Sequence, residues 1–331
     1  MVAVISYCFM VNDWEEKLTN QIKRVYNSGL YESADELYLF VTDTTNTLKD
    51  KLDSIMSNYP KYIVEYTNTN FGEGIMALKK VDELCRLKDD YKILYFHTKG
   101  VFNKYKNFDT KEINNLKLDG VNTWVEMLEY FLIDNWKECV TKLDDYDTVG
   151  VTNNGNWWWG NFWWTKSSHV QKNIPFSEYY GGSRWSCEAW LHDSNKFKEN
   201  IKPYEMFRFE WDPYYTVIPK YLYDGSDLNE LKIEIIGAEF GYFAEQRDEG
   251  TALGVMEDRL TDVTEILKNI VNDDKSKISI VCNNNTFNCD PSSGLPNSTR
   301  IKFKTNVDNN EYVITSFPYF GKIHIGNVKN N

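Results

Sequence analysis

Short apolar segments alternate with amphipathic segments through the first hundred residues of the chain. The apolar segments are residues 2–5, 36–42, 62–66 and 92–96, and the amphipathic segments are residues 13–27, 47–58 and 74–88. Apolar residues three and four positions apart are typical of helices, and unbroken apolar runs are typical of strands buried on both faces. This alternation predicts an α/β fold with a mostly parallel sheet and helices on both of its faces.

Ligands bind beyond the carboxyl ends of the strands in sheets of this kind. The first strand ends at Ser6 and Tyr7, the second is followed by Asp43, and the fourth is followed by His97 to Gly100. We therefore expect a functional site at this edge of the predicted sheet.

The composition of the chain changes near residue 225, where Asp-Gly-Ser-Asp at 224–227 is typical of a turn or linker. Strand-like segments separated by Asn, Pro and Gly follow it. The sequence thus predicts two domains, an α/β domain over residues 1–224 and a β-rich, β-sandwich-like accessory domain over residues 225–331.

Charge and hydropathy exclude some kinds of partner. The chain has 37 Lys and Arg against 49 Asp and Glu, a formal net charge of −12, so broad attraction to nucleic acid is not expected. No run of about 18 apolar residues predicts a membrane span. The short apolar start is typical of a strand rather than a signal peptide, and the six cysteines form no CxxC pair, so we expect a cytoplasmic protein.

Tryptophan is concentrated in the middle of the chain. Ten of the 11 Trp lie between Trp124 and Trp211, and five of them lie within residues 155–164. Large aromatic side chains mostly serve packing, but neither a helix nor a strand can bury Trp157, Trp158 and Trp159 on one face. We therefore expect at least one of these rings to be exposed or to line a binding site, where it would stack on the apolar face of a sugar.

Four motifs in order resemble a family of GT-A-type glycosyltransferases from bacteria and large DNA viruses. They are Asn-Phe-Gly-Glu-Gly at 70–74, the segment ending in His-Thr-Lys-Gly at 97–100, Gly-Asn-Phe-Trp-Trp at 160–164 and Glu-Ala-Trp-Leu at 188–191. The resemblance covers roughly residues 1–210. It implies a GT-A fold, a nucleotide-diphosphate sugar such as a UDP- or GDP-sugar as donor, and a glycan acceptor, in the synthesis of a cell-surface or capsid glycan.

The resemblance also implies donor-binding residues at the carboxyl edge. These are Ser6, Tyr7, Asp43, Asn70, Gly72, Gly74, His97 and Lys99. Glycines before a helix allow a ligand to approach the backbone, although a plain strand-to-helix turn has the same pattern. Many GT-A enzymes hold Mn²⁺ or Mg²⁺ with an Asp-x-Asp pair where this chain has His97-Thr98-Lys99, so a requirement for metal stays open. A Lys ammonium can itself offset the charge of a diphosphate.

The remaining motifs imply acceptor-binding residues and a general base. We expect Asn161, Trp163, Trp164, Arg184 and Trp185 to contact the acceptor. By the same resemblance, Glu188 is the base that takes the proton of the acceptor hydroxyl in an inverting transfer. A purely structural role for Glu188, as a helix cap or a partner of Arg184, is the alternative.

Two other functions remain as alternatives. A non-catalytic carbohydrate-binding protein would use the same aromatic residues without turning over a donor. A nucleotidyltransferase usually needs a Gly-rich first loop with Lys or Arg, and residues 6–13 contain none. The accessory domain carries a weaker resemblance to β-rich modules, and a homodimer formed through it is one of its expected roles.

Overall fold

The computed structural model describes residues 1–68, 74–99, 111–195, 200–226, 231–244, 258–271, 278–292, 295–308, 310–317 and 322–325. The chain divides into two compact units. Unit 1 comprises residues 1–103 and 128–208, and unit 2 comprises residues 104–127 and 209–331. The second unit therefore starts at Phe209 rather than at residue 225, and it includes a segment from the first half of the chain.

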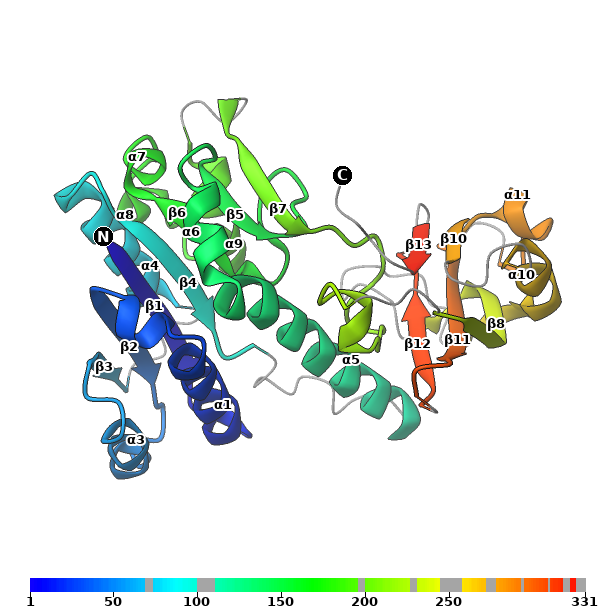
Figure 1. Cartoon of the computed structure of the whole chain (residues 1–331), viewed down its shortest axis with the longest axis horizontal. Coiled ribbons are helices and arrows are strands. Elements are labelled where there is room, and N and C mark those ends of the chain that lie inside the picture. Colours follow the sequence, from blue (N-terminus) through cyan, green and yellow to red (C-terminus); the bar gives the residue numbers. More distant parts are fainter. Residues whose placement is uncertain are drawn as a thin grey trace. The chain divides into compact units, whose positions relative to one another are not determined.

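Unit 1 is built on a seven-stranded, mostly parallel sheet with the order β3-β2-β1-β4-β6-β5-β7 (Figure 1). The strands are β1 (Val2–Phe9), β2 (Glu36–Thr42), β3 (Tyr62–Thr67), β4 (Lys92–His97), β5 (Thr148–Val151), β6 (Trp163–Lys166) and β7 (Pro203–Phe207). Only β6 runs antiparallel to its neighbours β4 and β5. The α/β class and the mostly parallel sheet expected from the alternating segments are confirmed.

The strand order reverses between β1 and β4. The chain adds β2 and β3 on one side of β1 and then returns to pair β4 with its other side, in parallel. In the register of this pair, Tyr7 lies beside His97. Ligands of parallel α/β sheets bind outside the carboxyl ends of the strands at such a reversal.

Helices connect the strands of unit 1. They are α1 (Trp14–Asn27), α2 (Leu30–Ser33), α3 (Lys49–Met56), α4 (Ile75–Leu87), α6 (Trp136–Lys142), α7 (Ser167–Val170), α8 (Phe176–Tyr179), α9 (Arg184–Asp193) and a short 3₁₀ turn, η3 (Trp159–Asn161). Before α6 the chain forms α5 (Lys111–Glu129) and a π-helical turn, η2 (Tyr130–Asp134).

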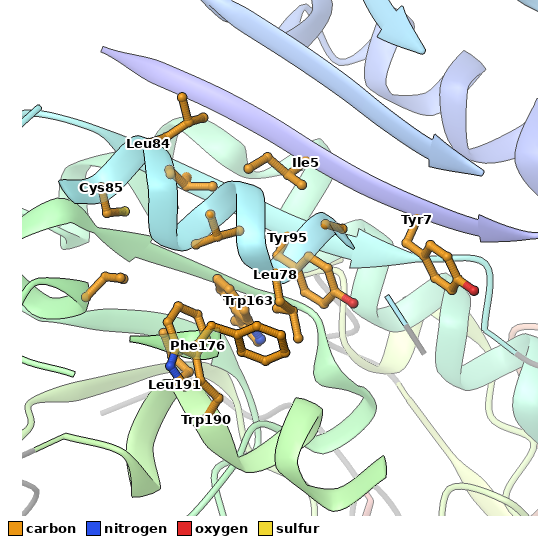
Figure 2. Packing of buried hydrophobic residues seen from close by; sticks show 14 of the residues in the cluster. Ile5, Tyr7, Leu78, Leu84, Cys85, Tyr95, Trp163, Phe176, Trp190 and Leu191 are labelled. Carbon is orange, nitrogen blue, oxygen red and sulfur yellow. The ribbon is translucent and has the colours of Figure 1, made fainter. Parts of the chain in front are cut away.

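A hydrophobic cluster packs one face of the sheet against α4, α8 and α9. Ile5 of β1 and Trp163 of β6 are buried in it together with Leu78 of α4. Figure 2 shows Phe176, Trp190 and Leu191 gathered beside Trp163, while Tyr7 stands apart toward the carboxyl end of β1. The other face is covered as well, since the indole N–H of Trp164 donates to the carbonyl of Leu132 at 2.8 Å.

Unit 2 contains two antiparallel sheets among its described residues, in accord with the β-rich character expected for the end of the chain. The larger sheet has the order β12-β11-β8-β9, and the smaller pairs β10 with β13. The elements are η5 (Lys220–Leu222), β8 (Ile233–Tyr242), β9 (Arg259–Asp262), α10 (Thr264–Val271), β10 (Ile278–Val281), α11 (Asn284–Phe287), β11 (Ser298–Thr305), β12 (Tyr312–Thr315) and β13 (Lys322–Ile325).

The first part of α5 belongs to unit 2 because it packs against the segment after residue 209. The Trp124 and Tyr214 rings meet edge to face at 5.3 Å between centroids. A Cβ on Gly120 would lie 2.5 Å from the carbonyl oxygen of Tyr214, so only glycine allows this approach. The composition change near residue 225 carries no signal of these contacts.

Across the described parts of both units, no helix is long and apolar enough to cross a membrane.

Candidate functional site

Strained backbone is concentrated at the carboxyl edge of the unit 1 sheet. Four of the five non-glycine residues with positive φ, among those described, are Asn12 after β1, Asn46 after β2, Thr152 after β5 and Asn161 before the antiparallel β6. All four positions lie at the same edge. Thr152 is β-branched and has φ of 50°, which is costly for such a residue. Strain of this kind persists where the surrounding structure enforces it, often at functional sites.

A lysine that the sequence analysis did not select lies at the reversal between β1 and β4. The Lys17 ammonium, in the first turn of α1, donates to the carbonyl of Lys99 at 3.3 Å. It also lies 3.5 Å from a carboxylate oxygen of Asp13. A charged residue in a helix is usually read as a solvated surface position, and only its place directly after β1 could have singled it out. We call Asn12, Asp13, Lys17, His97 and Lys99 the β1–β4 edge.

His97 connects the β1–β4 edge to the tryptophan-rich segment. Its Nε2 lies 3.1 Å from the carbonyl oxygen of Gly160. A carbonyl oxygen only accepts, so Nε2 carries the proton and donates this hydrogen bond. The imidazole also meets the Phe162 ring edge to face at 5.2 Å between centroids. His97 therefore holds the segment before β6 against the end of β4.

Gly74 and Tyr7 shape the same edge. Gly74 has φ of +80°, and a Cβ on it would lie 2.4 Å from the hydroxyl oxygen of Tyr95 and 3.5 Å from the Tyr7 ring. Only glycine fits, and α4 begins at the next residue. The Tyr7 hydroxyl donates to the hydroxyl of Thr42 at 3.4 Å, which ties the ends of β1 and β2 together.

The side chains of Ser6 and Asp43 form hydrogen bonds within the protein. The Ser6 hydroxyl is buried and donates to the carbonyl of Tyr38 at 3.0 Å. The buried Asp43 carboxylate accepts hydrogen bonds from Thr45, Thr47, Leu48 and Tyr66. Burial alone would raise the pKa of Asp43, but these hydrogen bonds outweigh it and hold the pKa well below its ordinary value. Both residues stabilise the edge rather than offer an atom to a ligand.

The Asn-Phe-Trp-Trp motif contributes core residues. The Asn161 side-chain oxygen accepts from the Trp163 indole N–H at 2.9 Å, and Asn161 is buried. Trp163 and Trp164 are 1% and 0% exposed, and they point to opposite faces of a sheet that is covered on both. We expected these side chains at the acceptor, but neither ring has a face open to a ligand.

Trp157 and Trp185 instead form an aromatic pair at the surface. Trp185 is 63% exposed, and its ring centroid lies 6.2 Å from that of the half-buried Trp157. Of the three consecutive tryptophans, Trp158 is fully buried and Trp157 and Trp159 are half-buried, so none of the three rings is fully exposed. The Asn154 side chain fixes this loop by accepting from the backbone N–H groups of Asn156 and Trp157. We call Trp157 and Trp185 the tryptophan pair.

Glu188 lies on the helix that carries Trp185. This helix, α9, starts at Arg184, and Ser183 caps it by accepting from the N–H of Trp185 at 3.2 Å. Glu188 is thus in the second turn of the helix, half-buried.

Residues three and four apart share one face of a helix, so Glu188 lies on a stripe between Trp185 and His192. Both ends of this stripe contact the loop after β5, because Trp185 meets Trp157 and His192 meets Trp158 at 5.7 Å between ring centroids. Glu188 therefore lies on the face of α9 that contacts the same loop as the tryptophan pair.

Two buried histidines support this arrangement. The Nε2 of His192 lies 3.0 Å from the Thr148 hydroxyl, and the Nε2 of His169 donates to the Leu191 carbonyl at 2.8 Å. Burial lowers the pKa of His169 to about 4 and that of His192 to about 3. Both are therefore neutral at pH 7 and act in packing rather than in proton transfer.

Three further residues were expected in the site: Asn70, Gly72 and Arg184. Asn70 and Gly72 lie outside the described residues. Arg184 is the first residue of α9.

The described side chains do not form the carboxylate metal site that many GT-A enzymes have. No three His, Cys, Asp or Glu side chains come together in the part of the chain that the structure describes. Near the strand ends, the Asp43 oxygens are occupied by hydrogen bonds and Asp13 faces an ammonium group. At the position of the Asp-x-Asp pair, this chain has His97-Thr98-Lys99.

No protein-family model matches the chain, and a comparison with curated proteins finds no similar sequence.

Proposed function

We propose that the chain is a GT-A-type glycosyltransferase that moves a sugar from a nucleotide-diphosphate sugar to a hydroxyl of a saccharide. One observation carries the proposal. A single edge of a parallel sheet holds cationic residues at the strand-order reversal, and the same edge continues, through the His97–Gly160 hydrogen bond, into the loop that bears the tryptophan pair.

The donor would bind at the β1–β4 edge. A diphosphate needs positive charge and N–H donors, and this edge has Lys17 and Lys99 beside the reversal. The N-terminus of α4, which has no acidic residue in its first turn, opens at the same edge next to Tyr7. Its backbone N–H groups favour an anion. A UDP- or GDP-sugar supplies that anion.

The acceptor would bind at the tryptophan pair. A sugar has apolar C–H faces that stack on aromatic rings and hydroxyl groups that need polar partners. The exposed ring of Trp185 provides the first, and Asn154 and Asn156 in the adjoining loop are exposed and provide the second.

Glu188 would act as the general base of an inverting displacement. The proton of the acceptor hydroxyl moves to the Glu188 carboxylate as the oxygen bonds to the anomeric carbon. The bond from that carbon to the diphosphate oxygen breaks, and its electron pair leaves with the diphosphate, whose charge the lysines of the β1–β4 edge offset.

A screen of nucleotide sugars by thermal shift, followed by an assay for free nucleoside diphosphate, tests the proposal. A true donor raises the unfolding temperature by mass action. Nucleoside diphosphate should then be released faster when a saccharide acceptor is added. If no nucleotide sugar stabilises the protein and none is turned over, the proposal fails.

The tryptophan pair alone also favours a non-catalytic carbohydrate-binding protein. Such a protein would bind glycans through Trp185 and release no nucleoside diphosphate from any donor. The same assay therefore separates the two functions.

A further inference from the structure

The Lys17 ammonium group lies among the expected donor residues, although Lys17 was not one of them. Lys17 lies in the first turn of α1, directly after β1, yet it reaches across to the carbonyl that follows β4. It therefore spans the two strands between which the order reverses. Its side chain is 15% exposed, which is low for a lysine on a helix.

Both contacts of this ammonium group are long. They measure 3.3 Å to the Lys99 carbonyl and 3.5 Å to Asp13. Charge-assisted N–H···O hydrogen bonds are usually about 2.7–2.9 Å long. Lys17 is thus held in position by weak contacts, and a phosphate oxygen would be a stronger partner.

The carboxylate of Asp13 is incompletely satisfied. One of its oxygens, Oδ1, is buried and has no hydrogen-bond partner, although Asp13 precedes α1 where a side chain often caps the helix. The Asp13–Lys17 pair therefore has imperfect geometry, and a diphosphate would compete with Asp13 for the Lys17 ammonium group.

We propose that Lys17 binds the diphosphate of the donor at the β1–β4 edge, and that this binding requires no divalent metal. The inference rests on the proposed function, since it names the residue that offsets the charge of the leaving group. It agrees with the mismatch between the described side chains and a metal site. When the diphosphate binds, the Lys17 ammonium group exchanges its contact with the Asp13 carboxylate for a contact with a phosphate oxygen.

Binding of UDP and GDP, measured by calorimetry in the presence of EDTA, tests the proposal. We expect Lys17→Gln to weaken binding about 10- to 100-fold, because one charged hydrogen bond is lost. Lys17→Arg should restore most of it. Lys23→Gln is the matched control, because Lys23 is exposed on the same helix and should bind like the wild type.

Asp13→Asn separates a binding role from a structural one. If Lys17 only supports the fold through Asp13, both substitutions break the same pair and should weaken nucleotide binding alike. If Lys17 binds the diphosphate, Asp13→Asn removes a competitor, and binding should be equal or tighter. Unchanged unfolding temperatures for Lys17→Gln and Lys23→Gln would exclude misfolding as the cause.

Three results would overturn the inference. They are nucleotide binding by the wild type only with Mn²⁺ or Mg²⁺, wild-type affinity in Lys17→Gln, and equal losses in Lys17→Gln and Asp13→Asn. Metal-dependent sugar transfer would leave the proposed function intact and remove only this inference. Absence of both binding and transfer under all metal conditions would remove the proposed function itself.

Discussion

Two sets of tryptophans within about thirty residues of sequence have opposite environments in unit 1. Trp163 and Trp164 are fully buried on the two faces of the sheet, and their indole N–H groups are hydrogen-bonded inside the protein. Trp157 and Trp185 meet at the surface, on a loop and a helix start at the carboxyl edge. Aromatic content alone therefore does not locate a sugar-binding site. The difference lies in whether the ring sits in a strand of a doubly covered sheet.

Truncation of a buried ring should produce the largest difference between the two sets. We expect Trp164→Ala to lower the free energy of unfolding by about 3–5 kcal/mol, because it leaves a cavity and an unsatisfied Leu132 carbonyl. Urea denaturation measures this loss, and Trp185→Ala is the control that should lose little. Equal losses of unfolding free energy in Trp164→Ala and Trp185→Ala would contradict the difference in environment between the two sets of tryptophans.

Adding a methyl group beside a buried tryptophan should lower the free energy of unfolding by a smaller amount. A Cβ on Gly150 would lie 2.4 Å from the ring of the buried Trp158, so Gly150→Ala forces the ring to shift. We expect a loss of about 1–3 kcal/mol in urea denaturation. Gly181→Ala is the matched control, since a Cβ there meets nothing within 4 Å. A neutral Gly150→Ala would mean that Trp158 is loosely packed.

Acid should lower the free energy of unfolding through the buried His169. Its folded-state pKa of about 4 is below its ordinary value of 6.5, so the unfolded chain binds more protons between these values and stability falls as the pH drops below 6.5. In His169→Gln, an amide N–H can replace the donor to Leu191 but does not titrate.

The wild type should therefore lose about 1 kcal/mol more than His169→Gln between pH 7.5 and pH 5.5. Titrating groups that do not interact with His169, including the buried Glu129, are common to both proteins and cancel in this difference. Parallel pH profiles for the two proteins would contradict the neutral, buried state of His169.

The smallest effect concerns the tryptophan pair. Trp185→Ala should weaken binding of a saccharide acceptor about 2- to 10-fold, while the unfolding temperature stays unchanged. Saturation-transfer NMR with oligosaccharides measures the binding. Wild-type affinity in this variant would remove the tryptophan pair from the acceptor site and leave it as a surface contact.

Local pattern identified most elements of unit 1 but not their environment. The strand over residues 36–42 has the expected bounds, because its unbroken apolar run ends at a polar turn. The strand β6 was missed, since its tryptophans were read as a ligand-facing segment. The compact units divide at residue 209 because α5 packs on a distant segment, and such a contact leaves no local signature.

The candidate site was predictable in its location and less so in its residues. Parallel strand ends pointed to Tyr7 and His97, which are neighbours across β1 and β4. Asp43 has the right position, but its hydrogen bonds within the loop are visible only in three dimensions. Lys17 was missed because its reach across to Lys99 depends on how α1 packs beside β4.

Nucleoside diphosphate release by Glu188→Gln tests glycosyl transfer at this edge most directly. The donor found for the wild type is supplied with a saccharide acceptor, and donor affinity is measured in parallel. Glu178→Gln, which alters an exposed glutamate on α8, is the control. We expect Glu188→Gln to bind the donor normally and to lose transfer about 100- to 10,000-fold, with Glu178→Gln unaffected. Near-normal turnover by Glu188→Gln would contradict the role of Glu188 as the base.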